Sequence, residues 1–241
     1  MINLATTLRS MRSIDGWLTD KEGAVLYTLA QACPSDMAIV EIGSWKGRST
    51  LCLASGSTEG NSARVYAIDP HTGSKEHQQL FGQVWTFDEF KNNLEKHGVA
   101  QSVTPIVSTS AEAAETFAGT YNQTIGLLFI DGDHSYESAK EDLELWFPKV
   151  AVGGIVAFHD ALTWEGVSRL VDETVYRSPH FKKPRIASST VYAQKVDRNT
   201  QLDRLENRAR LFLKKVFQNK RVLIGYFRRW KRSLKQKLKR V

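Results

Sequence analysis

The sequence predicts an α/β fold with a doubly wound, mostly parallel sheet, and two observations carry that prediction. Short apolar segments alternate with segments of helical spacing along most of the chain, which is the pattern of βαβ units. The β-branched run Ile39–Ile42 passes into a glycine loop and then into a helical pattern from Ser49. This order lets a backbone approach a ligand closely while a helix N-terminus points at its negative charge.

Composition is typical of a soluble protein. The 241 residues are 41% hydrophobic and 24% charged, enough for one α/β domain with an appendage. No apolar run approaches the roughly 20 residues of a membrane span, and no signal-peptide core is apparent at the N-terminus. The two cysteines, Cys33 and Cys52, have no metal or redox spacing. We therefore expect a cytoplasmic protein.

Charge is distributed unevenly along the chain. Of the 33 Lys and Arg residues, 14 follow Glu206, where no Asp or Glu occurs, which leaves 19 against all 26 acidic residues. The body is therefore acidic although the net charge is +7. Such an asymmetry predicts two segments with separate roles, a domain over residues 1–198 and a basic helical tail over residues 199–241.

The elements of the body follow in order. A capping box, Thr19–Glu22, opens a helix over Ala24–Ala32, and residues 1–12 form a loose arm or a short helix. The long polar segment His71–Val84 is interpreted as a lid, and Ser178–Pro184 as a mobile loop. Further strands are predicted over Arg64–Ile68, Val103–Val107, Ile125–Ile130, Ile155–Phe158 and Ser189–Gln194, and helices over Phe87–His97, Ala111–Phe117, Trp164–Tyr176 and a segment ending at Phe147.

The spacing of the glycine loop excludes two nucleotide motifs. A dinucleotide fingerprint requires a glycine where Trp45 stands, and a Walker loop requires wider glycine spacing and a lysine where Arg48 stands. The remaining pattern is Glu-x-Gly-x-x-x-Gly-x-Ser. Asp69 closes the next strand, where βαβ sites hold a ribose hydroxyl pair, although an ordinary loop aspartate is the alternative. Ser110 follows another strand and is either an adenine contact or a helix N-cap.

Two further strand ends carry acidic residues. Asp131 follows one strand, and His159 and Asp160 follow another, so all three meet at the carboxyl edge of the sheet. Two carboxylates with an imidazole suit Mg²⁺, or Mn²⁺ if the histidine binds directly; two capped turns are the alternative. His134 is placed to take a proton from an acceptor hydroxyl, or to bond a neighbouring carboxylate.

These segments resemble a known family. Ile-Asp-Gly-Asp-His-Ser-Tyr-Glu at 130–137, Gly-Gly-Ile-Val-Ala-Phe-His-Asp at 153–160 and Gly-Trp-Leu at 16–18 are similar to class I S-adenosylmethionine (SAM) methyltransferases. The branch is that of the macrocin- and mycinamicin-type sugar O-methyltransferases and cephalosporin-hydroxylase-like proteins. The resemblance implies a Rossmann-like sheet with a last antiparallel strand. It implies SAM contacts from the glycine loop and three strand ends: Glu41, Gly43, Ser44, Trp45, Gly47, Ser49, Asp69, Ser110 and Asp131.

The same resemblance implies roles in the reaction. Asp131 and Asp160 would hold a magnesium ion, and His134 stands where the family has its general base. His159 departs from the pattern, since a carboxylate is more usual there, so metal-independent transfer stays open. We expect methyl transfer to a hydroxyl of a sugar, a glycosylated molecule or another small molecule. The alternatives are a hydroxylase-like member and a non-catalytic binding module that docks to a membrane or RNA through its tail.

The tail has apolar residues at helical spacing from Leu202 onward, with Lys and Arg between them. That pattern over residues 208–241 is typical of an interfacial helix on an anionic membrane surface, which would make the protein peripheral to a membrane. RNA binding is disfavoured, because the body shows no RNA-recognition motif. Packing on a partner subunit, including a homo-oligomer, is the third alternative.

Overall fold

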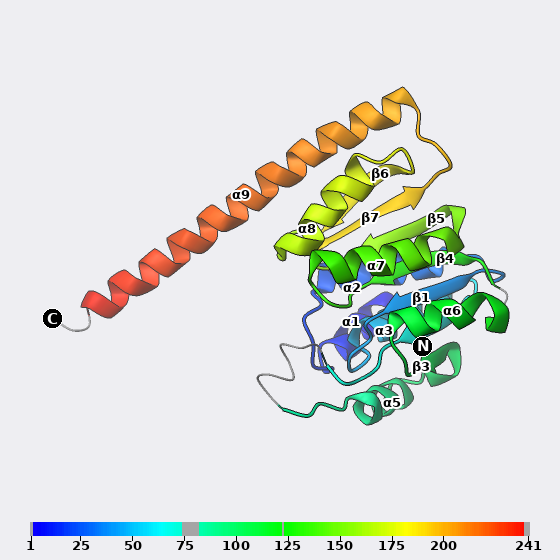
Figure 1. Ribbon diagram of the computed structural model, residues 1–241. Coiled ribbons are helices and arrows are strands. Elements are labelled where there is room, and N and C mark those ends of the chain that lie inside the picture. Colours follow the sequence, from blue (N-terminus) through cyan, green and yellow to red (C-terminus); the bar gives the residue numbers. More distant parts are fainter. Residues whose placement is uncertain (1, 74–81, 122, 239–241) are drawn as a thin grey trace.

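A computed structural model describes residues 2–73, 82–121 and 123–238 (Figure 1). It contains a seven-stranded sheet with the strand order β3-β2-β1-β4-β5-β7-β6. The strands are β1 (Ala38–Ile42), β2 (Arg64–Ile68), β3 (Val103–Ile106), β4 (Ile125–Ile130), β5 (Val150–Phe158), β6 (Phe181–Ala187) and β7 (Thr190–Lys195). Strands β1 to β5 pair in parallel, and β7 pairs antiparallel with both β5 and β6. The predicted doubly wound α/β fold is confirmed.

Helices cover both faces of the sheet. The first layer holds α1 (Leu4–Met11), α2 (Asp20–Gln31), α3 (Arg48–Glu59) and α5 (Phe87–Lys96), and the second holds α6 (Ser110–Tyr121), α7 (Tyr136–Trp146) and α8 (Glu165–Val171). Ile39 packs with the first layer and Val40 with the second, and both are fully buried. A central strand buried on both faces accounts for the continuous apolar composition of β1 and β4. Short helical turns η1 (Ala100–Ser102) and η2 (Phe147–Lys149) precede β3 and β5.

Strand β6 corrects one prediction. The segment Ser178–Pro184, predicted as a mobile loop, supplies the first half of an edge strand. The pairing of β6 with β7 shifts register between Lys182 and Arg185, and Lys183 has a φ of 52°. Such an irregularity on an edge strand accommodates a proline, which cannot donate to the ladder. Sequence reasoning treated Pro184 as a loop marker for that reason.

The predicted lid over residues 71–84 falls mostly on residues 74–81, which lie outside the described residues. Its described start is anchored: the His71 imidazole is buried, and its Nδ1 lies 2.9 Å from the Thr86 hydroxyl. The Thr86 backbone N–H donates to the His71 carbonyl at 3.0 Å. The two ends of this segment are therefore held together beside α5.

The C-terminal helix α9 (Gln201–Leu238) packs on the body along its first half and projects beyond it along its second (Figure 1). The Asn207 amide donates to the Phe181 carbonyl at 2.9 Å. Lys214, fully buried, pairs at 2.6 Å with Asp172 in the π-helical turn η3 (Asp172–Tyr176). The division at residues 198 and 199 stays a prediction. Among the described residues, no helix is long and apolar enough to cross a bilayer.

Candidate active site

The glycine loop between β1 and α3 is built around two left-handed glycines, Gly43 with φ 83° and Gly47 with φ 86°. A Cβ on Gly43 would lie 2.2 Å from the backbone oxygen of Asp131. The loops after β1 and β4 are therefore in contact, and only glycine fits at that contact. Trp45 between them also has a positive φ of 48°, and its ring lies 6.1 Å from that of Trp17.

The Asp69 carboxylate at the end of β2 organises this loop. Its Oδ2 accepts hydrogen bonds from the backbone N–H groups of Ser44 at 2.9 Å and Trp45 at 2.7 Å. Its Oδ1 accepts from the His71 N–H at 2.6 Å. Asp69 thus lies against the glycine loop as predicted, and the structure adds a second role, since it fixes the loop backbone. Ribose binding by this side chain stays a prediction.

Two further side chains of the loop region are buried. Glu41 accepts a hydrogen bond from the Thr50 hydroxyl, and burial raises its pKa to about 8 despite hydrogen bonds from Ser49 and Thr50. Glu41 is therefore mostly protonated at neutral pH. The Ser44 hydroxyl is 1% exposed and has no hydrogen-bond partner among the described residues. A buried polar atom of this kind fits a ligand that supplies the missing partner.

Ser110 lies at the start of α6, but its hydroxyl serves the protein interior. The Ser110 Oγ accepts a hydrogen bond from the Trp146 indole N–H at 2.9 Å. Thr109, and not Ser110, is the N-cap, since the Thr109 hydroxyl accepts from the Glu112 N–H at 3.3 Å. The N-cap alternative for Ser110 is therefore wrong by one residue, and its adenine contact stays a prediction.

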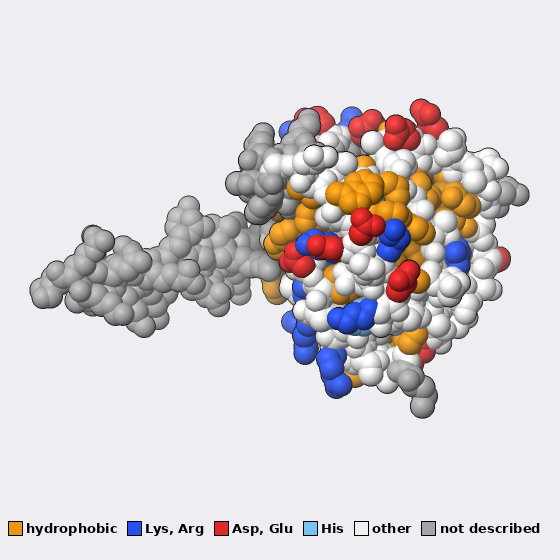
Figure 2. Space-filling view, turned by 90° about the horizontal axis from the view of Figure 1, so that it is seen from below, with side chains coloured by type: hydrophobic (Ala, Val, Ile, Leu, Met, Phe, Trp, Pro, Cys, Tyr) orange, Lys and Arg blue, Asp and Glu red, His pale blue; other side chains and the backbone are white. Residues whose placement is uncertain are grey.

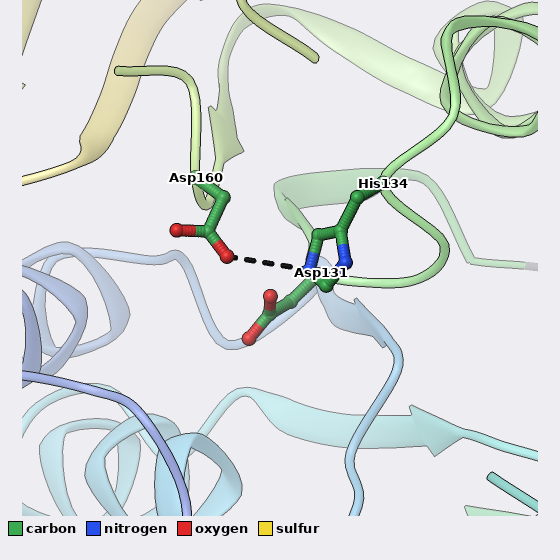
Figure 3. Close-up of side chains that lie close together, drawn as sticks. All are labelled: Asp131, His134 and Asp160. Carbon is green, nitrogen blue, oxygen red and sulfur yellow. Dashed lines mark ion pairs between the residues drawn. The ribbon is translucent and has the colours of Figure 1, made fainter. Parts of the chain in front are cut away.

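Asp131, His134 and Asp160 come together at the carboxyl edge of the sheet (Figure 3). Ligand atoms from the three side chains lie within 4.8 Å of one another. The His134 Nε2 lies 3.3 Å from the Asp160 Oδ2, and the His134 ring stacks on Trp164 with centroids 4.4 Å apart and planes at 7°. A Cβ on Gly166 would lie 2.6 Å from the His134 carbonyl oxygen, so the start of α8 holds this loop closely.

His159 lies behind that cluster and faces three carboxylates. Its Nδ1 is 2.9 Å from the Asp131 Oδ1 and 3.3 Å from the Asp160 Oδ2, and its Nε2 is 3.6 Å from the Glu22 Oε1. Burial would lower the pKa of this imidazole, but the charge of Asp131 and hydrogen bonds that the ring donates to the carboxylates raise it far above its usual range. His159 is therefore an imidazolium.

The ring nitrogens of His159 face Glu22, Asp131 and Asp160, so this side chain is positioned as a counter-ion of the carboxylates. The predicted metal set of Asp131, His159 and Asp160 stays a prediction. The three residues placed around a common position are Asp131, His134 and Asp160. Burial would raise the pKa of Asp160, but hydrogen bonds from His134, His159 and Thr163 lower it, which keeps this carboxylate charged.

A family model described as a methyltransferase domain matches residues 40–161, from β1 to just past the end of β5. The chain belongs to this methyltransferase family. Two curated relatives are uncharacterised proteins: y4gI of Sinorhizobium fredii, 27% identical over 123 residues, and R132 of Acanthamoeba polyphaga mimivirus, 26% identical over 128 residues. These matches cover 51% and 52% of this methyltransferase but only 13% and 52% of the relatives' own lengths.

Solved structures with the same fold include several O-methyltransferases. TomG from Streptomyces achromogenes, in complex with SAM, matches with a TM-score of 0.57 at 16% identity, over 80% of this chain and 89% of that one. NovP matches with 0.57 at 19% identity over 73% and 80%. CalS11, a TDP-rhamnose 3′-O-methyltransferase, matches with 0.54 at 20% identity, over 79% of each chain. At these identities the likeness establishes the fold.

One residue of the candidate site lies outside the matched segment and was missed by sequence reasoning. Glu22, fully buried at the start of α2, uses Oε2 for the predicted capping box with Thr19. Its Oε1 accepts from the Ser189 N–H at 2.9 Å and faces His159. Burial would raise the pKa of Glu22, but hydrogen bonds from His159, Ser189 and Thr19 lower it to about 2. The capping box was its only signal in the sequence.

Proposed function

We propose that this protein transfers a methyl group from SAM to a hydroxyl of a sugar or of a glycosylated small molecule. Family membership supports methyl transfer. The observation that carries the proposal is the position of His134, a candidate base 3.3 Å from Asp160. Its loop begins at Asp131, whose backbone oxygen touches the glycine loop at Gly43. A candidate base and a candidate cofactor loop are thus brought together by neighbouring strand ends.

The residues around the glycine loop fit SAM. The Ser44 hydroxyl lacks a partner among the described residues, and the left-handed Gly43 and Gly47 carry no side chain of their own at the two ends of the loop. Asp69 accepts three backbone N–H groups, which leaves one lone pair on Oδ1 for a ribose hydroxyl. When bound, SAM supplies an electrophilic methyl on its sulfonium.

His134 would act as the general base. The imidazole faces Asp160 through Nε2 at 3.3 Å, and a neutral ring in this position can take a proton from a hydroxyl. Asp160 would then stabilise the imidazolium that forms when an acceptor hydroxyl loses its proton, as a buried carboxylate does for a catalytic histidine. Stacking on Trp164 fixes the plane of the ring, and such positioning supplies much of the rate in a displacement reaction.

A divalent cation fits the same position. Glu22, Asp131 and Asp160 oppose one imidazolium, His159, so the charge balance favours a further cation. Asp131 and Asp160 would hold it, because Mg²⁺ is commonly bound by one or two carboxylates and several waters. Such an ion would lower the pKa of an acceptor hydroxyl.

The test is the exchange His134→Gln, read in two assays. Transfer from labelled SAM to a panel of sugars, sugar nucleotides and glycosides, with and without Mg²⁺, should fall by about 10²–10⁴-fold, the usual contribution of a general base. SAM affinity measured by calorimetry should stay within about twofold, since only the proton acceptor is removed. His180→Gln, an exposed histidine on the edge-strand side, is the matched control and should change neither.

Three outcomes would contradict the proposal. Joint loss of SAM binding and transfer in His134→Gln would show that the ring holds the fold or the cofactor and not the proton. SAM binding by the unaltered protein, with transfer to no hydroxyl acceptor in the panel or in cell extracts, would favour the non-catalytic binding module. Failure to bind SAM at all would leave the hydroxylase-like alternative.

A further inference from the structure

Helix α9 carries a stripe of exposed apolar side chains along its first half. Leu202 is 78% exposed, Phe212 68% and Phe217 63%. The stripe consists of Leu202, Leu205, Phe212, Leu213, Val216 and Phe217. At 3.6 residues per turn these positions share one side of the helix, and that side carries large hydrophobic groups into solvent.

The opposite side of α9 is fixed to the body. The Lys214 ammonium is buried between the Ser168 hydroxyl at 2.8 Å and the Asp172 carboxylate at 2.6 Å. The Gln218 amide donates to the Ser168 hydroxyl at 2.8 Å, and Asn207 bonds to the β6 backbone. Since these contacts fix the rotation of the helix about its axis, the stripe cannot turn inward.

A cavity of about 240 Å³ lies beside the stripe, between α9 and the end of η3. Its lining residues are Tyr176, Arg177, Arg204, Arg208 and Leu211. Around the helix, Arg204 and Arg208 fall between the stripe and the docked side. No ion pair with a carboxylate is described for these three arginines in the resolved ranges of the chain. The exposed side chains of Arg177, Arg204 and Arg208 therefore place positive charge beside the stripe.

The positive charge of the C-terminal segment indicates which partner would cover the exposed apolar stripe. The chain carries 14 Lys and Arg and no acidic residue after Glu206, whereas acidic and basic side chains are mixed on the face of the body in Figure 2. A second copy of α9 would bring like charges together. RNA would pair with the charge but leave large apolar groups unburied. A bilayer containing anionic lipid satisfies both the charge and the apolar stripe.

We propose that α9 binds the surface of an anionic phospholipid bilayer through the side opposite the body. The stripe from Leu202 to Phe217 enters the boundary between headgroups and acyl chains, and Arg204 and Arg208 beside it face the anionic headgroups. This surface begins at residue 202, before the predicted 208–241 segment. It is independent of methyl transfer, so vesicle binding and catalysis are measured separately.

The experiment is flotation of the full-length chain with vesicles of phosphatidylcholine alone or mixed with phosphatidylglycerol. The unaltered protein should bind only the mixed vesicles. The double exchange Phe212→Asp with Phe217→Asp should weaken binding at least about tenfold for each phenylalanine, from the lost burial of the ring. Arg204→Gln with Arg208→Gln should weaken it by about fivefold per arginine. Val152→Asp, at a 58% exposed position in β5, is the control and should bind normally.

Three results would overturn the proposal. The first is absence of binding to phosphatidylglycerol vesicles at low salt. If the protein instead binds RNA with a steep salt dependence, RNA is the partner of the tail. The second is unchanged vesicle binding by the phenylalanine variant, because binding would then depend on non-specific charge attraction and not on the apolar stripe. The third is a dimer of the unaltered protein that becomes monomeric in that variant, because the stripe would then be covered by a second copy. Melting temperatures of all variants verify that each is folded.

Discussion

The exchange His159→Gln tests the assignment of a buried imidazolium to the site. It keeps a polar side chain of similar reach but removes the positive charge that faces Glu22 at 3.6 Å, Asp131 at 2.9 Å and Asp160 at 3.3 Å. Glu22 is fully buried and His159 is 5% exposed. The carboxylates would therefore keep their burial and lose their counter-ion, which is the costly way to break a buried pair.

The expected loss of stability can be bounded from Glu22. Its pKa falls from 4.5 to about 2, which corresponds to about 3 kcal/mol in favour of the charged form, shared among His159, Ser189 and Thr19. Removing one partner of a buried charge pair costs about 3–5 kcal/mol. We expect His159→Gln to lower the free energy of unfolding at pH 7 by about that amount, and Glu22→Gln by a comparable amount.

Urea unfolding of the two single variants and the double variant measures the coupling. If the His159 ring and the Glu22 carboxylate interact, the double variant loses less free energy of unfolding than the sum of the two single variants. The difference should be at least about 1 kcal/mol. Glu206→Gln, in an exposed pair with Arg210, is the matched control and should cost about 0–1 kcal/mol. Additive losses, or a His159→Gln variant within 1 kcal/mol of the unaltered protein, would refute the buried imidazolium.

Three other outcomes follow from the same structure. Because the pKa of Glu22 is lowered to about 2, its stabilising contribution is present above about pH 4.5 and is lost as pH falls toward 2, which urea midpoints across that range will measure. Gly43→Ala should prevent folding, since its Cβ would lie 2.2 Å from a backbone oxygen, whereas Gly98→Ala, with φ 70° but nothing within 4 Å, should cost about 1 kcal/mol; thermal melts distinguish them. Lys214→Ala should cost about 3–5 kcal/mol and Lys215→Ala under about 1 in urea unfolding, because the former is buried and the latter 52% exposed on the same carboxylate.

The fold was predictable where burial dictates composition. Strands β1, β2 and β4 lie inside the sheet, so their apolar runs indicated both their type and their bounds. Strand β6 was not predictable. An edge strand pairs on one side only, and a register shift accommodates Lys183 and Pro184. The segment has the composition of a loop and forms a strand because it pairs with β7.

The part of the candidate site that follows from the topology of the sheet was predictable. The carboxyl ends of parallel strands meet at one edge, which brought Asp131 and Asp160 together with His134 nearby. The full surroundings of His159 were not accessible, since its third carboxylate, Glu22, comes from a helix far away in the sequence. Ser110 shows the same limit: its strand end was assigned correctly, but the direction of its hydroxyl depends on Trp146.

Glu22 also affects how short a fragment of this chain can be and still fold. A fragment cut to residues 40–161 would retain His159 and Asp160 but lose Glu22 and the β6–β7 hairpin that orients it through Ser189. In such a fragment His159 would keep Asp131 and Asp160 but lose the third carboxylate that faces its ring. Helix α2 is thus part of the framework of the candidate site, and among relatives the residues at positions 22 and 159 should co-vary.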